Sequence, residues 1–168
     1  MEKIELTKEE LSTIYKVLLN SKDKLFFGKK EVFNDYYGEY EEPFSKKIFE
    51  SILKKISKEL PKEDADDINK ESLRRKYHTY NNDVDEKIYS TLQKAFAERK
   101  SVDISYFNME SADFSNRELD VYYTSAKYTI GYCHLKKAIR KFRTSRISKA
   151  KINSGVYSIP EGFNKNNY

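Results

Sequence analysis

The stretch KYTIGYCHLKKAIRKFRTSRI, residues 127–147, carries the clearest structural signal in the chain. Tyr128, Ile130 and Tyr132 stand at every second position, which is the pattern of a β-strand over 127–134. A turn at 135–137 and a second strand over 138–143 are expected to follow. This pair of strands predicts that the fold is built on an antiparallel sheet.

The same stretch concentrates positive charge. Between Ala126 and Lys151 the chain has nine lysines and arginines and neither aspartate nor glutamate, although the formal net charge of all 168 residues is only +5. The rest of the chain is therefore net negative. A local excess of one sign of charge indicates a partner of the opposite sign.

Further strands are expected on both sides of this stretch. Residues 102–106 and 117–124 show strand alternation, and a polar loop separates them. After 143 we expect a single helical turn at 144–147, a fifth strand at 149–152 and a final short strand at 156–159. Short strands with brief connections that follow a helical half predict a small antiparallel barrel and an α+β fold.

Two helices are expected in the first 60 residues. Thr7 and Glu10 form a capping box, which predicts a helix that begins there and runs to about Asn20. Pro43 fits the first position of a second helix, whose apolar stripe continues to Leu60. Between the two helices, residues 25–40 are rich in aromatic side chains, which we interpret as a packing or dimer surface.

Residues 61–83 are charged and poor in apolar side chains, so we expect a connector there. Asp83 or Asp85 can cap a third helix over 84–99, which leads into the strands. The predicted organisation is a helical region at 1–60, a charged linker at 61–83, a domain at 84–163 with its barrel at about 101–159, and a tail at 164–168.

The composition excludes several classes of protein. Cys133 is the single cysteine, so no intrachain disulfide can form. The amino terminus has no apolar signal segment, and no apolar run approaches the length of a membrane helix, so we expect a soluble cytoplasmic protein. The chain has no glycine-rich phosphate loop, and His78 and His134 lack metal-ligand spacing. We therefore predict neither an enzyme nor a cofactor.

Arginines and tyrosines remain as the candidate binding residues. Arg140, Arg143 and Arg146 recur at every third position of the basic run, beside Tyr128 and Tyr132 of the preceding strand. A guanidinium suits phosphate or carboxylate, and a tyrosine ring can stack on a base. The pattern favours an anionic small molecule, a nucleotide or a short single strand over the simpler alternative, a strand edge kept soluble by charge.

The basic run IRKFRTSRI and the closing segment VYSIPEGF also resemble a known family. Over about 84–163 the chain resembles the WYL-domain proteins, a family of bacterial transcription regulators. Of the name-giving Trp-Tyr-Leu triplet only the central Tyr128 is kept, with Lys127 and Thr129 in the outer positions. The other matching residues are Arg117, Arg140, Phe142, Arg143, Arg146, Ile147, Tyr157, Pro160 and Phe163.

The resemblance implies a barrel of the Sm/SH3-like type with a basic pocket that binds an effector, often nucleic acid or a nucleotide. In the family this signal passes to a DNA-binding helix-turn-helix domain. Neither that domain nor the usual carboxy-terminal extension is found in these 168 residues, so we expect an excised piece of a longer regulator or a stand-alone sensor. The candidate site residues, including those that the resemblance adds, are Tyr128, Tyr132, His134, Arg140, Lys141, Arg143 and Arg146.

Two other functions stay open. The domain could itself grip single-stranded DNA or RNA, in which case affinity would fall steeply with salt. Alternatively, the helical half could serve dimerisation or another protein interaction, because its apolar stripe and aromatic residues exceed what a small core buries. A homodimeric sensor of an anionic effector would combine the effector-binding prediction with the dimerisation prediction.

Overall fold

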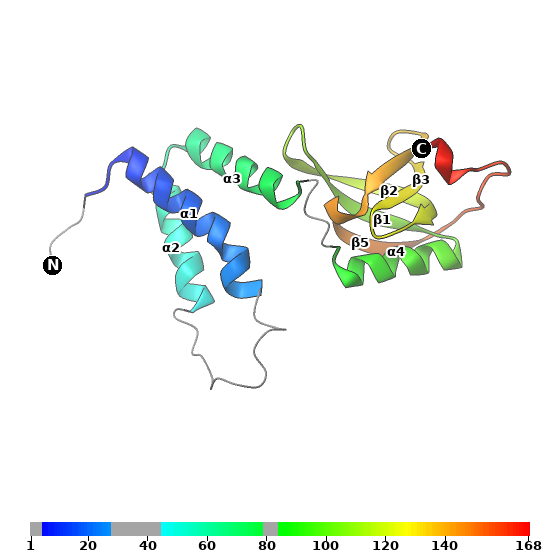
Figure 1. The fold of residues 1–168 in the computed structure, drawn as a ribbon, viewed down its shortest axis with the longest axis horizontal. Coiled ribbons are helices and arrows are strands. Elements are labelled where there is room, and N and C mark those ends of the chain that lie inside the picture. Colours follow the sequence, from blue (N-terminus) through cyan, green and yellow to red (C-terminus); the bar gives the residue numbers. More distant parts are fainter. Residues whose placement is uncertain (1–4, 28–44, 79–83) are drawn as a thin grey trace. The chain divides into compact units, whose positions relative to one another are not determined.

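The structure, a computed structural model, describes residues 5–27, 45–78 and 84–168. Along these residues four α-helices precede a five-stranded antiparallel sheet, so the α+β class predicted from the sequence is confirmed (Figure 1). The chain divides into two compact units, Met1–Leu73 and Arg74–Tyr168. None of the described helices combines the length and the hydropathy that a membrane span requires.

The capping box at the start of the first helix is present. The Thr7 amide donates to Glu10 Oε2 at 2.8 Å, and the Glu10 amide donates to Thr7 Oγ1 at 3.2 Å. Helix α1 spans Lys8–Phe27 and is longer than the prediction, which ended it near Asn20. The aromatic segment expected at 25–40 lies outside the described residues beyond Phe27.

Helix α2 spans Lys46–Glu59. Its N-cap is Ser45, whose hydroxyl oxygen accepts a hydrogen bond from the Ile48 amide at 3.1 Å. Pro43, predicted at the first position of this helix, lies outside the described residues. The C-cap of α2 is Leu60, where the sequence predicted that the apolar stripe would end.

Residues 61–83 differ from the prediction of a connector, because helix α3 spans Lys62–Lys76. Only Ala65 and Ile68 are buried along it, so its apolar periodicity was too sparse to recognise. The helical signal lay in its charges: acidic residues occupy the first turn and basic residues the last, which suits the helix dipole. The buried residues of the first unit are Tyr15, Phe49, Leu53, Leu60, Ala65 and Ile68.

Helix α4, Glu86–Glu98, is the first described helix that lies wholly within the second unit. Asp85, one of the two predicted caps, accepts from the Lys87 and Ile88 amides at 2.9 and 3.1 Å. The strands that follow are β1 (Lys100–Asn108), β2 (Asp113–Thr124), β3 (Tyr128–Cys133), β4 (Ala138–Arg143) and β5 (Ile147–Val156), with a short 3₁₀ helix, η1 (Thr144–Arg146), between the last two.

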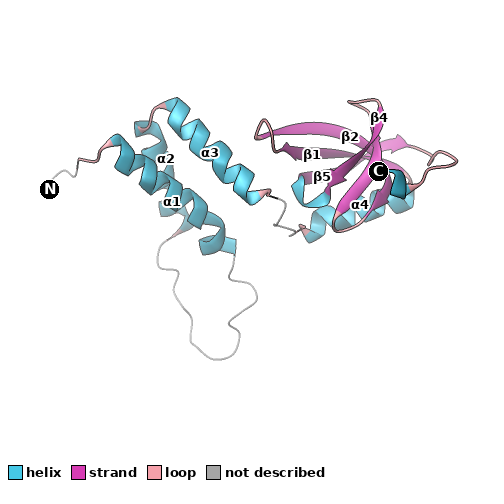
Figure 2. Cartoon of the chain, turned by 45° about the horizontal axis from the view of Figure 1, so that its top comes forward, coloured by secondary structure: helices cyan, strands magenta, loops and turns pink. Residues whose placement is uncertain are grey.

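The strands form one sheet in the order β4-β3-β2-β1-β5, with every pair antiparallel (Figure 2). No pairing between β4 and β5 closes this sheet within the described residues, so the predicted barrel is not shown. The final strand expected at 156–159 is wrong, because β5 itself extends to Val156 and residues 157–159 form no strand.

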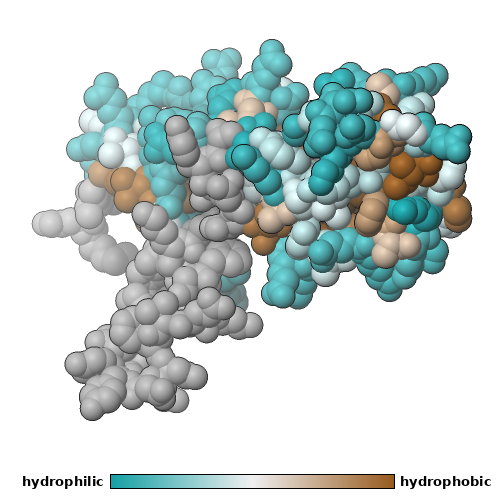
Figure 3. All heavy atoms as spheres, turned by 45° about the vertical axis from the view of Figure 1, so that its right-hand side comes forward, coloured by the Kyte–Doolittle hydropathy of each residue, from teal (hydrophilic) through white to brown (hydrophobic). Residues whose placement is uncertain are grey.

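Helix α4 packs on one face of this sheet and forms the core of the second unit. Leu92 and Ala95 are fully buried against the strands. Phe142 and Ile147, two of the residues that match the family pattern, are buried there, as is Cys133. Hydrophilic residues cover much of the described surface that Figure 3 shows, with apolar patches between them. We call the sheet face turned away from α4 the outer face.

Candidate ligand-binding site

The register of β3 and β4 divides the predicted site residues between the two faces of the sheet. Tyr128 pairs with Arg143, and Ile130 pairs with Lys141. Phe142, which lies between these two partners, is only 3% exposed and belongs to the core under α4. Because neighbouring side chains of a strand point to opposite faces, Tyr128, Lys141 and Arg143 extend from the outer face.

Three cationic groups surround the ring of Tyr128 on this face. Lys141 Nζ lies 4.6 Å from the ring centroid, Lys127 Nζ lies 5.5 Å away, and Arg143 Cζ lies 5.7 Å away. All three distances are within the range of a cation–π interaction. We call Lys127, Tyr128, Lys141 and Arg143 the Tyr128 cluster. An anion placed among these cations would offset their mutual repulsion.

Arg140 is not part of this cluster. It stands two residues before Phe142 and therefore belongs to the α4 face of β4, where its side chain is exposed. Tyr132 does lie on the outer face, opposite Asp120 of β2, and its ring meets the ring of His134 edge to face at 5.3 Å.

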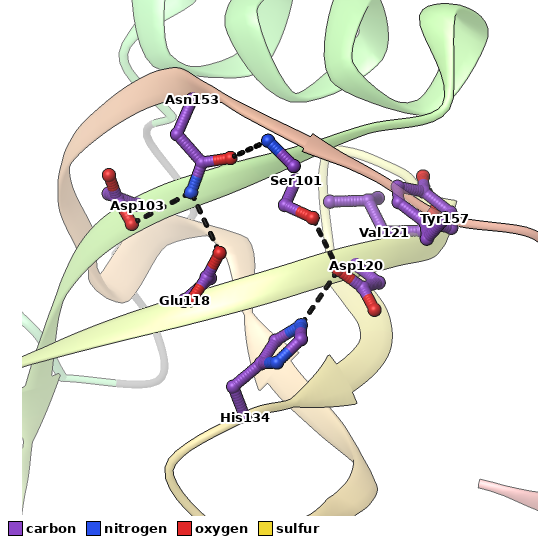
Figure 4. Close-up of polar contacts among 9 residues, drawn as sticks. Ser101, Asp103, Glu118, Asp120, Val121, His134, Asn153 and Tyr157 are labelled. Atoms are coloured by element: carbon purple, nitrogen blue, oxygen red, sulfur yellow. Dashed lines mark hydrogen bonds and ion pairs between the residues drawn. The ribbon is translucent and has the colours of Figure 1, made fainter.

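His134, an exposed residue in the turn after β3, contacts the buried Asp120 of β2, which also binds Ser101 of β1 (Figure 4). Its Nε2 lies 2.9 Å from Asp120 Oδ1, and the hydroxyl of Ser101 donates to the same oxygen at 2.6 Å. Asp120 is only 7% exposed, so its carboxylate needs these partners. His134 therefore has a structural task beside any contact with a ligand.

A second network lies next to it in Figure 4 and ties β5 to β1 and β2. The side-chain amide of Asn153 donates to Asp103 Oδ1 at 3.2 Å and to Glu118 Oε1 at 2.9 Å. An open depression of about 620 Å³ crosses these strands. It is lined by Asp103, Ile104, Ser105, Asn116, Arg117, Glu118, His134, Leu135, Lys149 and Lys151. Its lysines stand beside carboxylates, so it suits an anion less well than the Tyr128 cluster does.

Arg146 makes a different contact from the one predicted. Its Nε donates to the main-chain oxygen of Tyr77 at 3.3 Å. The Tyr77 ring stacks on Phe107, with centroids 4.6 Å apart, and meets Phe114 edge to face. This contact lies within the second unit and joins its first residues to the turn before β5.

Arg117, which matched the family pattern, is likewise engaged inside the fold. Its Nε donates to Ser115 Oγ at 3.1 Å, and its guanidinium lies 5.7 Å from the rings of both Tyr106 and Phe142. These contacts place it on the core side of the sheet.

Two tyrosines, Tyr122 of β2 and Tyr157 just after β5, have raised pKa values. The Tyr157 hydroxyl donates to the main-chain oxygen of Val121. Burial raises the pKa of Tyr157, an effect that Arg99 partly offsets. Burial also raises the pKa of Tyr122, with a further contribution from the charge of Asp120. Both phenols therefore stay protonated to a higher pH than an ordinary tyrosine does.

The structure thus brings together only part of the predicted set. Tyr128, Lys141 and Arg143 converge, and Tyr132 shares their face, whereas His134, Arg140 and Arg146 have other surroundings. Lys127 was missed as a site residue although it belongs to the basic stretch. Across the described ranges 5–27, 45–78 and 84–168, no three histidine, cysteine, aspartate or glutamate side chains are grouped to hold a metal ion.

Comparison with known proteins finds a family match for part of the second unit. Residues 87–152 match the family model described as the WYL domain. No curated protein sequence matches the chain. Among solved structures, the chain is similar to proteasome accessory factor B/C (PafBC) of Arthrobacter aurescens, with a TM-score of 0.38 and 17% sequence identity over 92% of this chain. The aligned part spans 22% of that longer protein. The segment 87–152, which runs from α4 into β5, therefore resembles a WYL domain.

Proposed function

We propose that this WYL domain senses an anionic effector, a nucleotide or a short single-stranded nucleic acid, at the Tyr128 cluster, and that it serves a transcription regulator. The family match supports a regulatory ligand-binding role. The observation that carries the choice of site is the convergence of Lys127, Lys141 and Arg143 around one tyrosine ring. The stretch 126–151 that supplies these cations contains no acidic side chain.

The chemistry of the cluster fits such a ligand in two ways. Lysine and arginine donate charge-assisted hydrogen bonds to phosphate oxygens, which are about twice as strong as neutral ones. The ring of Tyr128 offers a face on which a base can stack, worth about 1–3 kcal/mol per base in single-strand-binding proteins. Because Arg143 and Lys141 come from one strand and Tyr128 from its neighbour, the register of the hairpin sets the spacing of these groups.

The test measures binding of pyrophosphate, AMP and the tetranucleotide (dT)₄ by calorimetry. For each probe that the wild type binds, we expect Lys141→Ala to weaken the affinity about tenfold, or about 1.4 kcal/mol. The substitution removes a cation that lies 4.6 Å from the centroid of the Tyr128 ring. Arg140→Ala is the matched control, since it removes a neighbouring positive charge from the opposite face of β4. Equal losses in the two variants would show a general effect of charge and contradict the proposed site.

A second candidate is direct gripping of a longer single strand by the outer face. Lys165 Nζ lies 4.6 Å from the ring of Tyr123, which gives this part of the domain a second pairing of a cation with an aromatic ring. A strand that spanned both pairs would release several counterions, so its affinity would fall steeply with salt. Tight binding of a twelve-nucleotide strand without salt dependence would exclude this candidate.

A further inference from the structure

The chain after β5 returns to the sheet and fixes one aromatic residue there. A turn at 160–163 is closed by the Phe163 amide, which donates to the Pro160 main-chain oxygen at 3.1 Å. Gly162 within this turn has a φ of 84°, which glycine adopts without strain. The Phe163 ring then meets Tyr122 of β2 edge to face, with centroids 5.3 Å apart. Phe163 is thus held against a largely buried residue of the sheet.

Tyr168 makes two contacts, and both engage groups suited to a ligand. Its ring stacks on Phe163, with centroids 6.0 Å apart and planes 23° apart. Its main-chain oxygen accepts a hydrogen bond from Lys141 Nζ at 2.5 Å. The same ammonium group lies over the ring of Tyr128. One residue therefore supplies a planar ring to Phe163 and an oxygen acceptor to the Tyr128 cluster.

We propose that Phe163 and Lys141 form a two-part subsite for a ligand that carries both a planar ring and an anionic group, and that Tyr168 is its internal occupant, which such a ligand displaces. The inference rests on the proposed function, because Lys141 belongs to the Tyr128 cluster. It adds to that function an aromatic subsite and a competitor within the chain.

Few contacts hold the tail in place against such an exchange. Tyr168 is 42% exposed, and the helical turn before it, η2 (Lys165–Asn167), has only three residues. A phosphate oxygen can accept the same kind of hydrogen bond from the Lys141 ammonium group as the oxygen of Tyr168 does. A purine ring offers Phe163 a larger stacking partner than the phenol of Tyr168. Since Phe163 is fixed by the turn and by Tyr122, the subsite persists when Tyr168 leaves.

The experiment compares two probes, AMP and inorganic pyrophosphate, by calorimetry on the full chain. Tyr168→Ala removes the internal ring, and we expect it to bind AMP about three to ten times more tightly than the wild type. Phe163→Leu keeps an apolar side chain against Tyr122 but removes the stacking face. We expect it to weaken AMP binding about tenfold and to leave pyrophosphate binding unchanged. Leu135→Ala, in the exposed β3–β4 turn, is the control and should alter neither probe.

The outcomes separate this inference from the proposed function. If AMP binding depends on Lys141 but stays within twofold of wild type in Tyr168→Ala and Phe163→Leu, the subsite is wrong and the proposed function stands. If neither wild type nor Tyr168→Ala binds AMP, pyrophosphate or (dT)₄, both proposals fail. If AMP binds only when Tyr168 is replaced, the internal occupant is supported directly.

Discussion

At the scale of single residues, Gly131 shows how closely β3 passes the main chain of β2. A Cβ atom at Gly131 would lie 2.2 Å from the main-chain oxygen of Asp120. We therefore expect Gly131→Ala to destabilise the second unit by about 1–3 kcal/mol, the usual range for forced overpacking. Urea unfolding followed by hydrogen exchange of the β2 and β3 amides measures this loss.

Gly162→Ala is the control for this substitution. No atom lies within 4 Å of a Cβ atom at Gly162, so its cost of about 1–2 kcal/mol comes from the positive φ alone. Gly162→Ala should therefore destabilise only the turn and leave the protection of the sheet amides from hydrogen exchange unchanged. Unaltered sheet stability in Gly131→Ala would contradict the close approach of the two strands.

At the scale of elements, the capping box gives helix α1 a dependence on pH. The main-chain N–H and the hydroxyl of Thr7 both donate to Glu10 and hold the pKa of that carboxyl below its usual value of 4.5. A lowered folded-state pKa means that the stabilisation is complete above 4.5 and is lost as the pH falls from there through the folded-state value.

We therefore expect the amides of the first turn of α1 to lose protection from hydrogen exchange as the pH falls below about 4.5. Once it is protonated, the Glu10 carboxyl group is a weaker acceptor for the hydrogen bonds from Thr7. Glu10→Gln should abolish this pH dependence while it keeps the side chain's length. An NMR titration of Glu10 that gave a pKa at or above 4.5 would show that the capping box does not form in solution.

The helices and strands also show which parts of the fold could be predicted from the sequence alone. Local signals were sufficient for the helix caps at Thr7 and Asp85 and for the strands of the hairpin, because each depends on neighbouring residues. Helix α3 was missed because two buried residues make too weak a periodicity. Closure of a barrel could not be predicted, since it depends on contacts between strands far apart in sequence.

In the candidate site, too, local features could be predicted from the sequence and long-range contacts could not. The spacing of Arg140 and Arg143 in one strand already implied opposite faces, because side chains alternate with a period of two. The sequence could therefore have separated them. The contacts of Arg146 with Tyr77 and of Lys141 with Tyr168 join positions 69 and 27 residues apart, and no local pattern marks such pairs.

At the scale of the whole molecule, the two units have separate cores, one around Phe49 and one around Leu92. We expect Phe49→Ala to destabilise the first unit by about 3–5 kcal/mol, and Leu92→Ala to destabilise the second by about 2–5 kcal/mol, because each leaves a cavity in one core. Hydrogen exchange of amides in α2 and in β2 reports the two losses separately. Equal loss of protection in both units from either substitution would show a single cooperative core.

The central claim is that the Tyr128 cluster, rather than the depression beside His134, receives the effector. An NMR titration of the full chain with AMP and with (dT)₄ tests it most directly. We predict chemical-shift changes that saturate and centre on Lys127, Tyr128, Lys141 and Arg143. Changes centred instead on His134, Lys149 and Lys151, or no saturable change with either probe, would contradict the account.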